Sequence, residues 1–111
     1  MILYDGIITS LQGTGGVSVL FNELIKRMSS SGVEHKISIC DDKLCHKLGG
    51  GEDCILQSPR FLERYKDAIV STKYDIFHST YYRLPQGGCG KIVTTVHDYT
   101  YERYRSNIAK W

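Results

Sequence analysis

The chain has 111 residues, of which 41% are hydrophobic, and a net charge of +2 at pH 7. This length corresponds to one domain with enough apolar residues for a core, and no apolar run approaches the ~20 residues of a membrane-spanning helix. The small net charge gives no indication of a nucleic acid partner. The N-terminus lacks a basic segment followed by a long apolar run, so no signal peptide is predicted and we expect a cytoplasmic protein.

The four cysteines, Cys40, Cys45, Cys54 and Cys89, form no C-x-x-C pair, so neither a zinc ribbon nor a thioredoxin-like site is predicted. Cys45 and His46 could supply two metal ligands, but adjacent residues rarely bind one ion without a third ligand nearby. We therefore expect no metal site. The even count also permits two disulfides. Without a secretory signal, free thiols in a reducing compartment are the favoured expectation.

A glycine-rich stretch at residues 12–16 follows a short apolar run at 2–4 and opens a helical pattern. Apolar residues recur on one face of the predicted helix, at Val17, Leu20, Phe21, Leu24 and Met28. A helix start leaves backbone N–H groups unpaired, and glycines let a phosphate approach them. The stretch departs from G-x-G-x-x-G at Ser18 and lacks the Gly-Lys-Ser/Thr ending of a P-loop. It is either a phosphate-binding turn or a tight turn beneath neighbouring loops.

The remaining elements alternate between strands and helices. Gly32 suits the left-handed end of the first helix, and strands are predicted at 33–40, 54–57, 75–79 and 91–97. A short helix is expected over 41–48, and another begins near Tyr99. Ser58-Pro59 has the composition of a helix start. Apolar residues follow it at helical spacing, at Phe61, Tyr65, Ala68, Ile69 and Thr72. Residues 81–90 have the composition of a loop.

Strands that alternate with helices predict an α/β fold, with a doubly wound, mostly parallel sheet of about five strands. In such sheets, ligands bind outside the carboxyl ends of the strands. The glycine stretch, the polar residues after Phe77, and the pair His97-Asp98 all follow strands. Three polar features are therefore expected to meet at one edge of the sheet.

The polar residues at these strand ends are the candidate site residues. His97 either contacts a ligand, with Asp98 supporting it, or has its ring fixed by a backbone carbonyl. His78 holds the same position on its own strand, where a packed histidine is the favoured interpretation. Tyr81, Tyr82 and Arg83 either line a ligand groove, with aromatic rings stacked on sugar and the guanidinium on phosphate, or cover the sheet edge.

Three blocks together carry a resemblance to a known family. They are Gly13-Thr14-Gly15-Gly16-Val17 at a helix start, Tyr74-Asp75-Ile76-Phe77-His78-Ser79, and Val93-Thr94-Thr95-Val96-His97-Asp98. Their order and spacing resemble the N-terminal domain of family 4 glycosyltransferases of the GT-B fold. The resemblance implies a retaining, metal-independent enzyme with two Rossmann-like halves around a cleft. Such an enzyme needs no cofactor and moves a sugar from a nucleotide-sugar to a saccharide or lipid-linked acceptor.

The resemblance also implies roles for individual residues. Gly15 and Gly16 would contact the donor diphosphate, and His97, supported by Asp98, would lie beside the transferred sugar. His78, Tyr81 and Arg83 would fall on the acceptor side. Synthesis of a surface polysaccharide is the implied role, in the cytoplasm and at the inner face of the membrane.

By the same resemblance, residues 1–111 form a single acceptor-side domain without the donor-binding C-terminal domain. Such a chain alone is expected to be inactive, and an open edge at strand 91–97 would let it self-associate. Two alternatives remain: a free-standing module that binds a phosphorylated ligand, or one chain of a split glycosyltransferase. A third interpretation gives the three blocks a role in folding alone.

Overall fold

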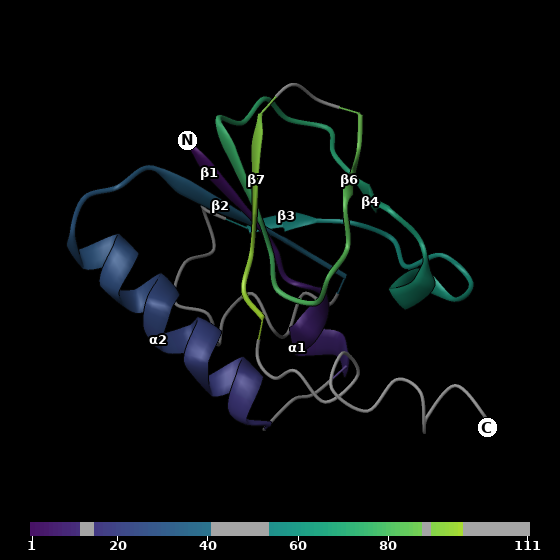
Figure 1. The fold of residues 1–111 in the computed structure, drawn as a ribbon, viewed down its shortest axis with the longest axis horizontal. Coiled ribbons are helices and arrows are strands. Elements are labelled where there is room, and N and C mark those ends of the chain that lie inside the picture. Colours follow the sequence, from purple (N-terminus) through teal and green to yellow (C-terminus); the bar gives the residue numbers. More distant parts are fainter. Residues whose placement is uncertain (12–14, 41–53, 88–89, 97–111) are drawn as a thin grey trace.

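The computed structural model describes residues 1–11, 15–40, 54–87 and 90–96 (Figure 1). Its elements, in chain order, are β1 (Ile2–Asp5), α1 (Ile7–Leu11), α2 (Gly16–Ser30), β2 (His35–Ile39), β3 (Cys54–Leu56), the 3₁₀ turn η1 (Glu63–Tyr65), β4 (Ala68–Ile69), β5 (Ile76–Ser79), β6 (Pro85–Gln86) and β7 (Lys91–Thr94). The helix predicted over 41–48, the pair His97-Asp98 and the helix predicted from Tyr99 lie outside the described residues.

Five strands form one parallel sheet in the order β3-β2-β1-β5-β7. In its centre, Tyr4 of β1 pairs with Ile37 of β2 and with His78 of β5. The predicted fold class is thus confirmed, with the strands at 33–40, 54–57, 75–79 and 91–97 each found within their predicted ranges. Because the strands are parallel, they all end at the same edge of the sheet, here called the carboxyl edge.

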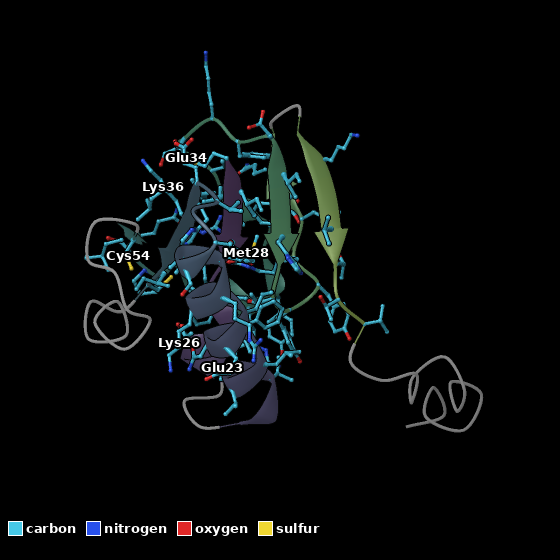
Figure 2. The ribbon with its side chains drawn as sticks, turned by 90° about the vertical axis from the view of Figure 1, so that its left-hand side faces the viewer. Glu23, Lys26, Met28, Glu34, Lys36 and Cys54 are labelled. Atoms are coloured by element: carbon cyan, nitrogen blue, oxygen red, sulfur yellow. The ribbon has the colours of Figure 1, made fainter. Side chains whose placement is uncertain are left out.

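Helix α2 covers one face of the sheet (Figures 1 and 2). Gly15 precedes it in an extended conformation, and Gly32 follows it at φ +76°, the left-handed position predicted from the sequence. The helix packs on apolar side chains that point to this face from β1 and β2. The cluster consists of Tyr4, Ile25, Ile37 and Ile39, with Ile2, Leu24, Met28 and Cys54 packed around it.

The buried face of α2 is rotated from the predicted one. Its buried residues are Ser18, Phe21 and Ile25, whereas Leu20 is 49% exposed. Steps of three and four residues place Ser18 and Ile25 on the same side of the helix as Phe21. Glu23 and Lys26 lie on the outer side, 3.5 Å apart (Figure 2). The small Ser18 was missed because periodicity is sought among large apolar residues.

The opposite face is covered by an extended segment instead of the predicted helix over 58–72. Residue 62 turns the chain through a left-handed conformation (φ +55°), and only the short turn η1 is helical. Ala68 then donates its N–H to the carbonyl of Leu84, which begins the pairing of β4 with β6. Tertiary pairing thus overrides the local helical pattern, and leaves Phe61 83% and Tyr65 74% exposed.

This extended cover still buries a core. Leu3 of β1, Phe77 of β5 and Ala68 of β4 form the second buried cluster. The prediction of a helix was therefore wrong, but one residue of its predicted apolar face, Ala68, is indeed a core residue. The predicted loop at 81–90 is also modified, because β6 lies within it.

Two local features were not predicted. Helix α1 follows β1 directly, and the turn between them requires Gly6, since a Cβ there would lie 2.5 Å from Cγ2 of Ile39. Cys54 is disulfide-bonded, contrary to the expectation of free thiols, while Cys40 is a free thiol. Within the described part of the chain, no helix combines the length and the apolar character needed to cross a membrane.

Candidate functional site

The N-terminus of α2 lies after β1, on the carboxyl edge. Its first backbone hydrogen bond runs from the N–H of Val19 to the carbonyl of Gly15, at 3.1 Å. The backbone N–H groups of the first turn therefore precede the hydrogen-bonded part of the helix, where the helix dipole favours an anion. Gly16 is exposed, and a Cβ built on it meets nothing within 4 Å among the described residues. Packing against the described residues therefore does not require a glycine here.

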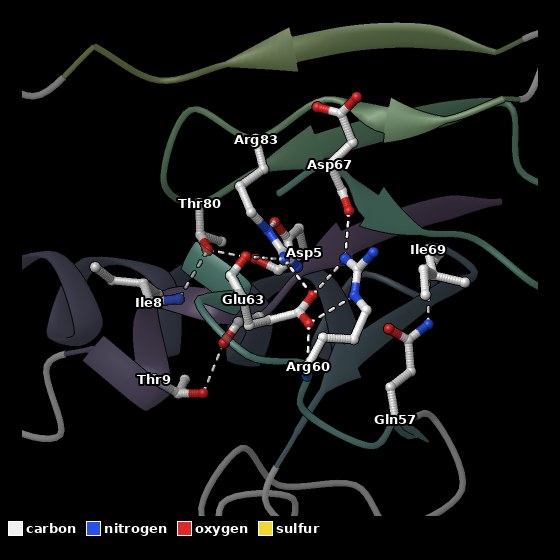
Figure 3. A network of polar contacts seen from close by, with 11 residues as sticks. Asp5, Ile8, Thr9, Gln57, Arg60, Glu63, Asp67, Ile69, Thr80 and Arg83 are labelled. Carbon is white, nitrogen blue, oxygen red and sulfur yellow. Dashed lines mark hydrogen bonds and ion pairs between the residues drawn. The ribbon is translucent and has the colours of Figure 1, made fainter. Parts of the chain in front are cut away.

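A buried ion pair fixes the end of β1. Asp5, the last residue of the strand, is fully buried and accepts two hydrogen bonds from Arg83, both at 2.7 Å (Figure 3). Nε and Nη2 of the guanidinium bind one carboxylate oxygen each, which is the bidentate geometry that makes such pairs strong. The segment after β5 is thereby tied to the end of β1, although 78 residues separate the partners.

Glu63 extends this pair into a network. Nη1 of Arg83 donates to Oε1 of Glu63 at 2.7 Å, and Arg60 donates from Nε and Nη2 to the same carboxylate at 2.8 Å (Figure 3). Hydrogen bonds from Arg60, followed by those from Arg83, lower the pKa of Glu63 from 4.5 to about 2. Turn η1 is therefore held against the carboxyl edge by charged groups, since its own side chains are not buried in the core.

Threonine hydroxyls complete the connection to α1. The hydroxyl of Thr80 donates to the backbone carbonyl of Asp5 and accepts a hydrogen bond from the N–H of Ile8 at 3.3 Å (Figure 3). The hydroxyl of Thr9 donates to the carbonyl of Gly6 at 2.7 Å. These bonds fix the first turn after β5 on the short helix that leads toward the glycine stretch.

His78 lies beneath α2, which shields one side of its ring from solvent. Its ring is 5.3 Å from that of Tyr4 and 5.5 Å from that of Phe21, and its Nε2 is 2.9 Å from the hydroxyl of Thr95. Burial lowers the pKa of His78 below its usual value of 6.5, so the ring is neutral near pH 7. These contacts agree with the packed histidine favoured by the sequence.

Arg83 and Tyr81 are placed differently. Only 5% of the Arg83 side chain is exposed, and its guanidinium is occupied by Asp5 and Glu63, so it does not offer a cation to an acceptor. Tyr81 is half-buried and accepts a hydrogen bond from Nη2 of Arg64 at 3.1 Å. Arg64 was not among the candidate residues, because its contact with Tyr81 joins two segments that no local pattern links.

A cavity of about 360 Å³ opens beside this network. Its lining comes from α1, from Cys40 after β2, and from the segment around η1: Ile7, Ser10, Leu11, Cys40, Pro59, Leu62, Glu63 and Arg64. Burial raises the pKa of the Cys40 thiol, which is therefore not activated as a nucleophile. A larger cavity of about 560 Å³ lies at the opposite edge, around Met1 and Asp75, far from the strand ends that the sequence indicated.

Of the candidate residues, the structure thus brings Gly15, Gly16, Tyr81 and Arg83 to the carboxyl edge, with His78 packed under α2. His97 and Asp98 lie outside the described residues. No protein-family model matches this chain, and neither a curated protein nor a solved structure matches it. Function is therefore inferred from the geometry of the carboxyl edge together with the resemblance of the three sequence blocks.

Proposed function

We propose that this chain is the acceptor-side part of a retaining glycosyltransferase, which transfers a sugar from a nucleotide-sugar to a saccharide or lipid-linked acceptor. The observation that carries the proposal is the exposed glycine start of α2 at the carboxyl edge of a parallel sheet. This is where open α/β sheets bind phosphorylated ligands. The resemblance of the three sequence blocks adds the reaction type.

The chemistry is consistent with this placement. Glycosyl transfer builds negative charge on the leaving diphosphate, and preorganised N–H groups lower the barrier by stabilising that charge. The first turn of α2 supplies such groups on a helix anchored by Phe21 and Ile25, so they need little reorganisation during the reaction. His97, with Asp98 beside it in sequence, is proposed to contact the transferred sugar.

The test uses the longest protein that the coding sequence around this chain specifies. It is incubated with UDP-, GDP- and dTDP-sugars, and release of the nucleoside diphosphate is measured with and without saccharide acceptors. We expect release from one donor class, and a loss of about 10²–10³-fold in kcat for Gly16→Val, the typical effect of losing one oxyanion contact. The matched control is Arg27→Val, which places the same side chain at an exposed position in the last turn of α2.

Two results would count against the proposal. One is the absence of donor turnover in a protein that carries a second Rossmann-like half. The other is full activity in Gly16→Val with an unchanged circular dichroism spectrum. If the coding sequence contains no second half, and the chain binds inorganic phosphate or a nucleotide without turnover, the alternative of a binding module or a split enzyme is supported instead.

A further inference from the structure

Four side chains form a continuous surface beside the carboxyl edge, here called the platform: Arg64, Tyr65, Tyr81 and Tyr82. The guanidinium carbon of Arg64 lies 5.3 Å from the ring centroid of Tyr65 and 5.5 Å from that of Tyr81. The rings of Tyr81 and Tyr82 are 5.7 Å apart. Tyr65 is 74% and Tyr82 52% exposed, so both present ring surface to solvent.

The platform is held in place from beneath. The neighbours of Arg64 and Tyr82 in the chain, Glu63 and Arg83, bind each other at 2.7 Å within the buried network. Two residues that are not glycine take left-handed conformations in the same two segments, Leu62 at φ +55° and Tyr82 at φ +57°. Such conformations cost free energy and persist only where the surrounding structure determines them. The exposed rings are thus presented on a fixed backbone.

Arg64 is the cation that the platform offers. Its hydrogen bond goes to the hydroxyl of Tyr81, and no carboxylate of the described residues forms an ion pair with it. Arg60 and Arg83, by contrast, are both paired with Glu63. The guanidinium of Arg64 lies close to two rings, and the planar fork of an arginine matches a carboxylate or phosphate.

We infer that the platform binds an anionic saccharide, with sugar rings against Tyr65 and Tyr82 and a carboxylate or phosphate substituent on Arg64. This inference rests on the proposed function and names its acceptor class. The aromatic faces take the apolar face of a sugar. One arginine without a carboxylate partner among the described residues suits one anionic substituent and is too little to follow the phosphate backbone of a nucleic acid.

The position relative to the glycine stretch suits an acceptor. Arg64 and Leu62 line the cavity that α1 closes on its other side through Ile7 and Leu11. Gly15 follows Leu11 by four residues, so the two Cα atoms are at most roughly 14 Å apart. A saccharide of a few residues on the platform can therefore extend toward the start of α2, where the donor diphosphate is proposed to lie.

The experiment titrates the chain with tetragalacturonate, which is anionic, and with maltotetraose, which is neutral, and follows backbone amide NMR signals. We expect tetragalacturonate to shift the signals of residues 64, 65, 81 and 82, and maltotetraose to bind about tenfold more weakly, the usual size of one charge-assisted hydrogen bond. Arg64→Gln should weaken tetragalacturonate binding about tenfold, and Tyr65→Ala by a similar factor. The control is Lys26→Gln, which removes an exposed cation on α2 and should leave binding unchanged.

Several results would overturn the inference: no binding of tetragalacturonate at ~10 mM, equal binding of both saccharides, or an equal effect of Lys26→Gln and Arg64→Gln. Phosphatidylglycerol vesicles test a membrane surface instead. Vesicle binding that is lost in Phe61→Ala, with no saccharide binding, would assign these loops to a lipid surface. Failure here is distinguishable from failure of the proposed function. Donor turnover without platform-dependent saccharide binding overturns only this inference. Saccharide binding without donor turnover overturns only the proposed glycosyltransferase activity.

Discussion

The buried pair of Asp5 and Arg83 makes the strongest prediction about stability. Arg83→Met keeps most of the side-chain volume but leaves the fully buried carboxylate of Asp5 without its cation. Removing one partner of a buried pair costs about 3–5 kcal/mol. Small domains are stable by about 5–15 kcal/mol, so this variant should lose a large part of its free energy of unfolding. For a domain near this size, the loss lowers the Tm by about 12–20 °C.

The assay is urea unfolding followed by circular dichroism, with Arg60→Met as the matched control. Arg60 binds the same Glu63, but 29% of its side chain is exposed, so its loss should cost about 1 kcal/mol. The double variant Asp5→Leu/Arg83→Met should recover much of the stability, because replacing a whole buried pair by apolar residues is often neutral. If Arg83→Met and Arg60→Met cost the same, the pair does not hold the strand end and the reasoning is wrong.

Four further outcomes are expected. Gly6→Ala should lower the free energy of unfolding in urea by about 1–3 kcal/mol, because the new Cβ meets Ile39 and the carbonyl of Ser38. Gly16→Ala should leave the free energy of unfolding unchanged, and equal effects of the two variants would contradict this expectation. The folded-state pKa of Glu63 is lowered to about 2, so its contribution to stability is complete above its ordinary pKa of 4.5 and is lost as the pH falls toward 2. Glu63→Gln should therefore make the free energy of unfolding less dependent on pH in this range. Because burial lowers the pKa of His78, the free energy of unfolding should decrease as the pH falls below 6.5. His78→Gln should reduce this dependence on pH, and an unchanged dependence would show that the histidine is solvated. Strand β7 lies at the edge of the sheet among the described residues and exposes Ile92 (48%) and Val93 (42%), so sedimentation should show self-association that Ile92→Lys weakens. A monomer at every concentration would refute this expectation.

The sheet could be predicted because its strands carry their own signal. Ile76–Ser79 and Lys91–Thr94 lie in compact apolar or β-branched runs, which favour strands whether they are partly buried, as in β5, or exposed, as in β7. The end of α2 was equally readable, since Gly32 takes the left-handed conformation that other residues avoid. The helix over 58–72 was predicted wrongly, because Ser58-Pro59 and the spacing of Phe61 and Tyr65 are local signals. The pairing of β4 with β6 is a distant interaction that no local pattern contains.

The candidate site was partly readable for the same reason. Gly15 and Gly16 could be placed because a strand, a glycine stretch and a helix follow one another directly in the chain. The role of Arg83 could not be read, because its partner Asp5 lies 78 residues away and an arginine beside two tyrosines also suits an exposed groove. Glu63 and Arg60 were missed altogether, since charged residues in a predicted amphipathic helix are assigned to solvent.

Among the described residues, no helix covers the face of the sheet opposite α2. This explains why a charged network holds the extended segment over that face. The extended segment contributes one fully buried apolar side chain, Ala68, to the second cluster, which is little area to stabilise its position. Directional bonds from Arg83 to Asp5 and Glu63 fix the position of the segment instead. A salt bridge of this kind contributes little net stability but strongly disfavours other arrangements, because any shift leaves a buried charge unpaired. The network therefore accounts for both the exposure of Tyr65 and Tyr82 and their fixed positions, so a cover with few apolar contacts can present a preorganised binding surface.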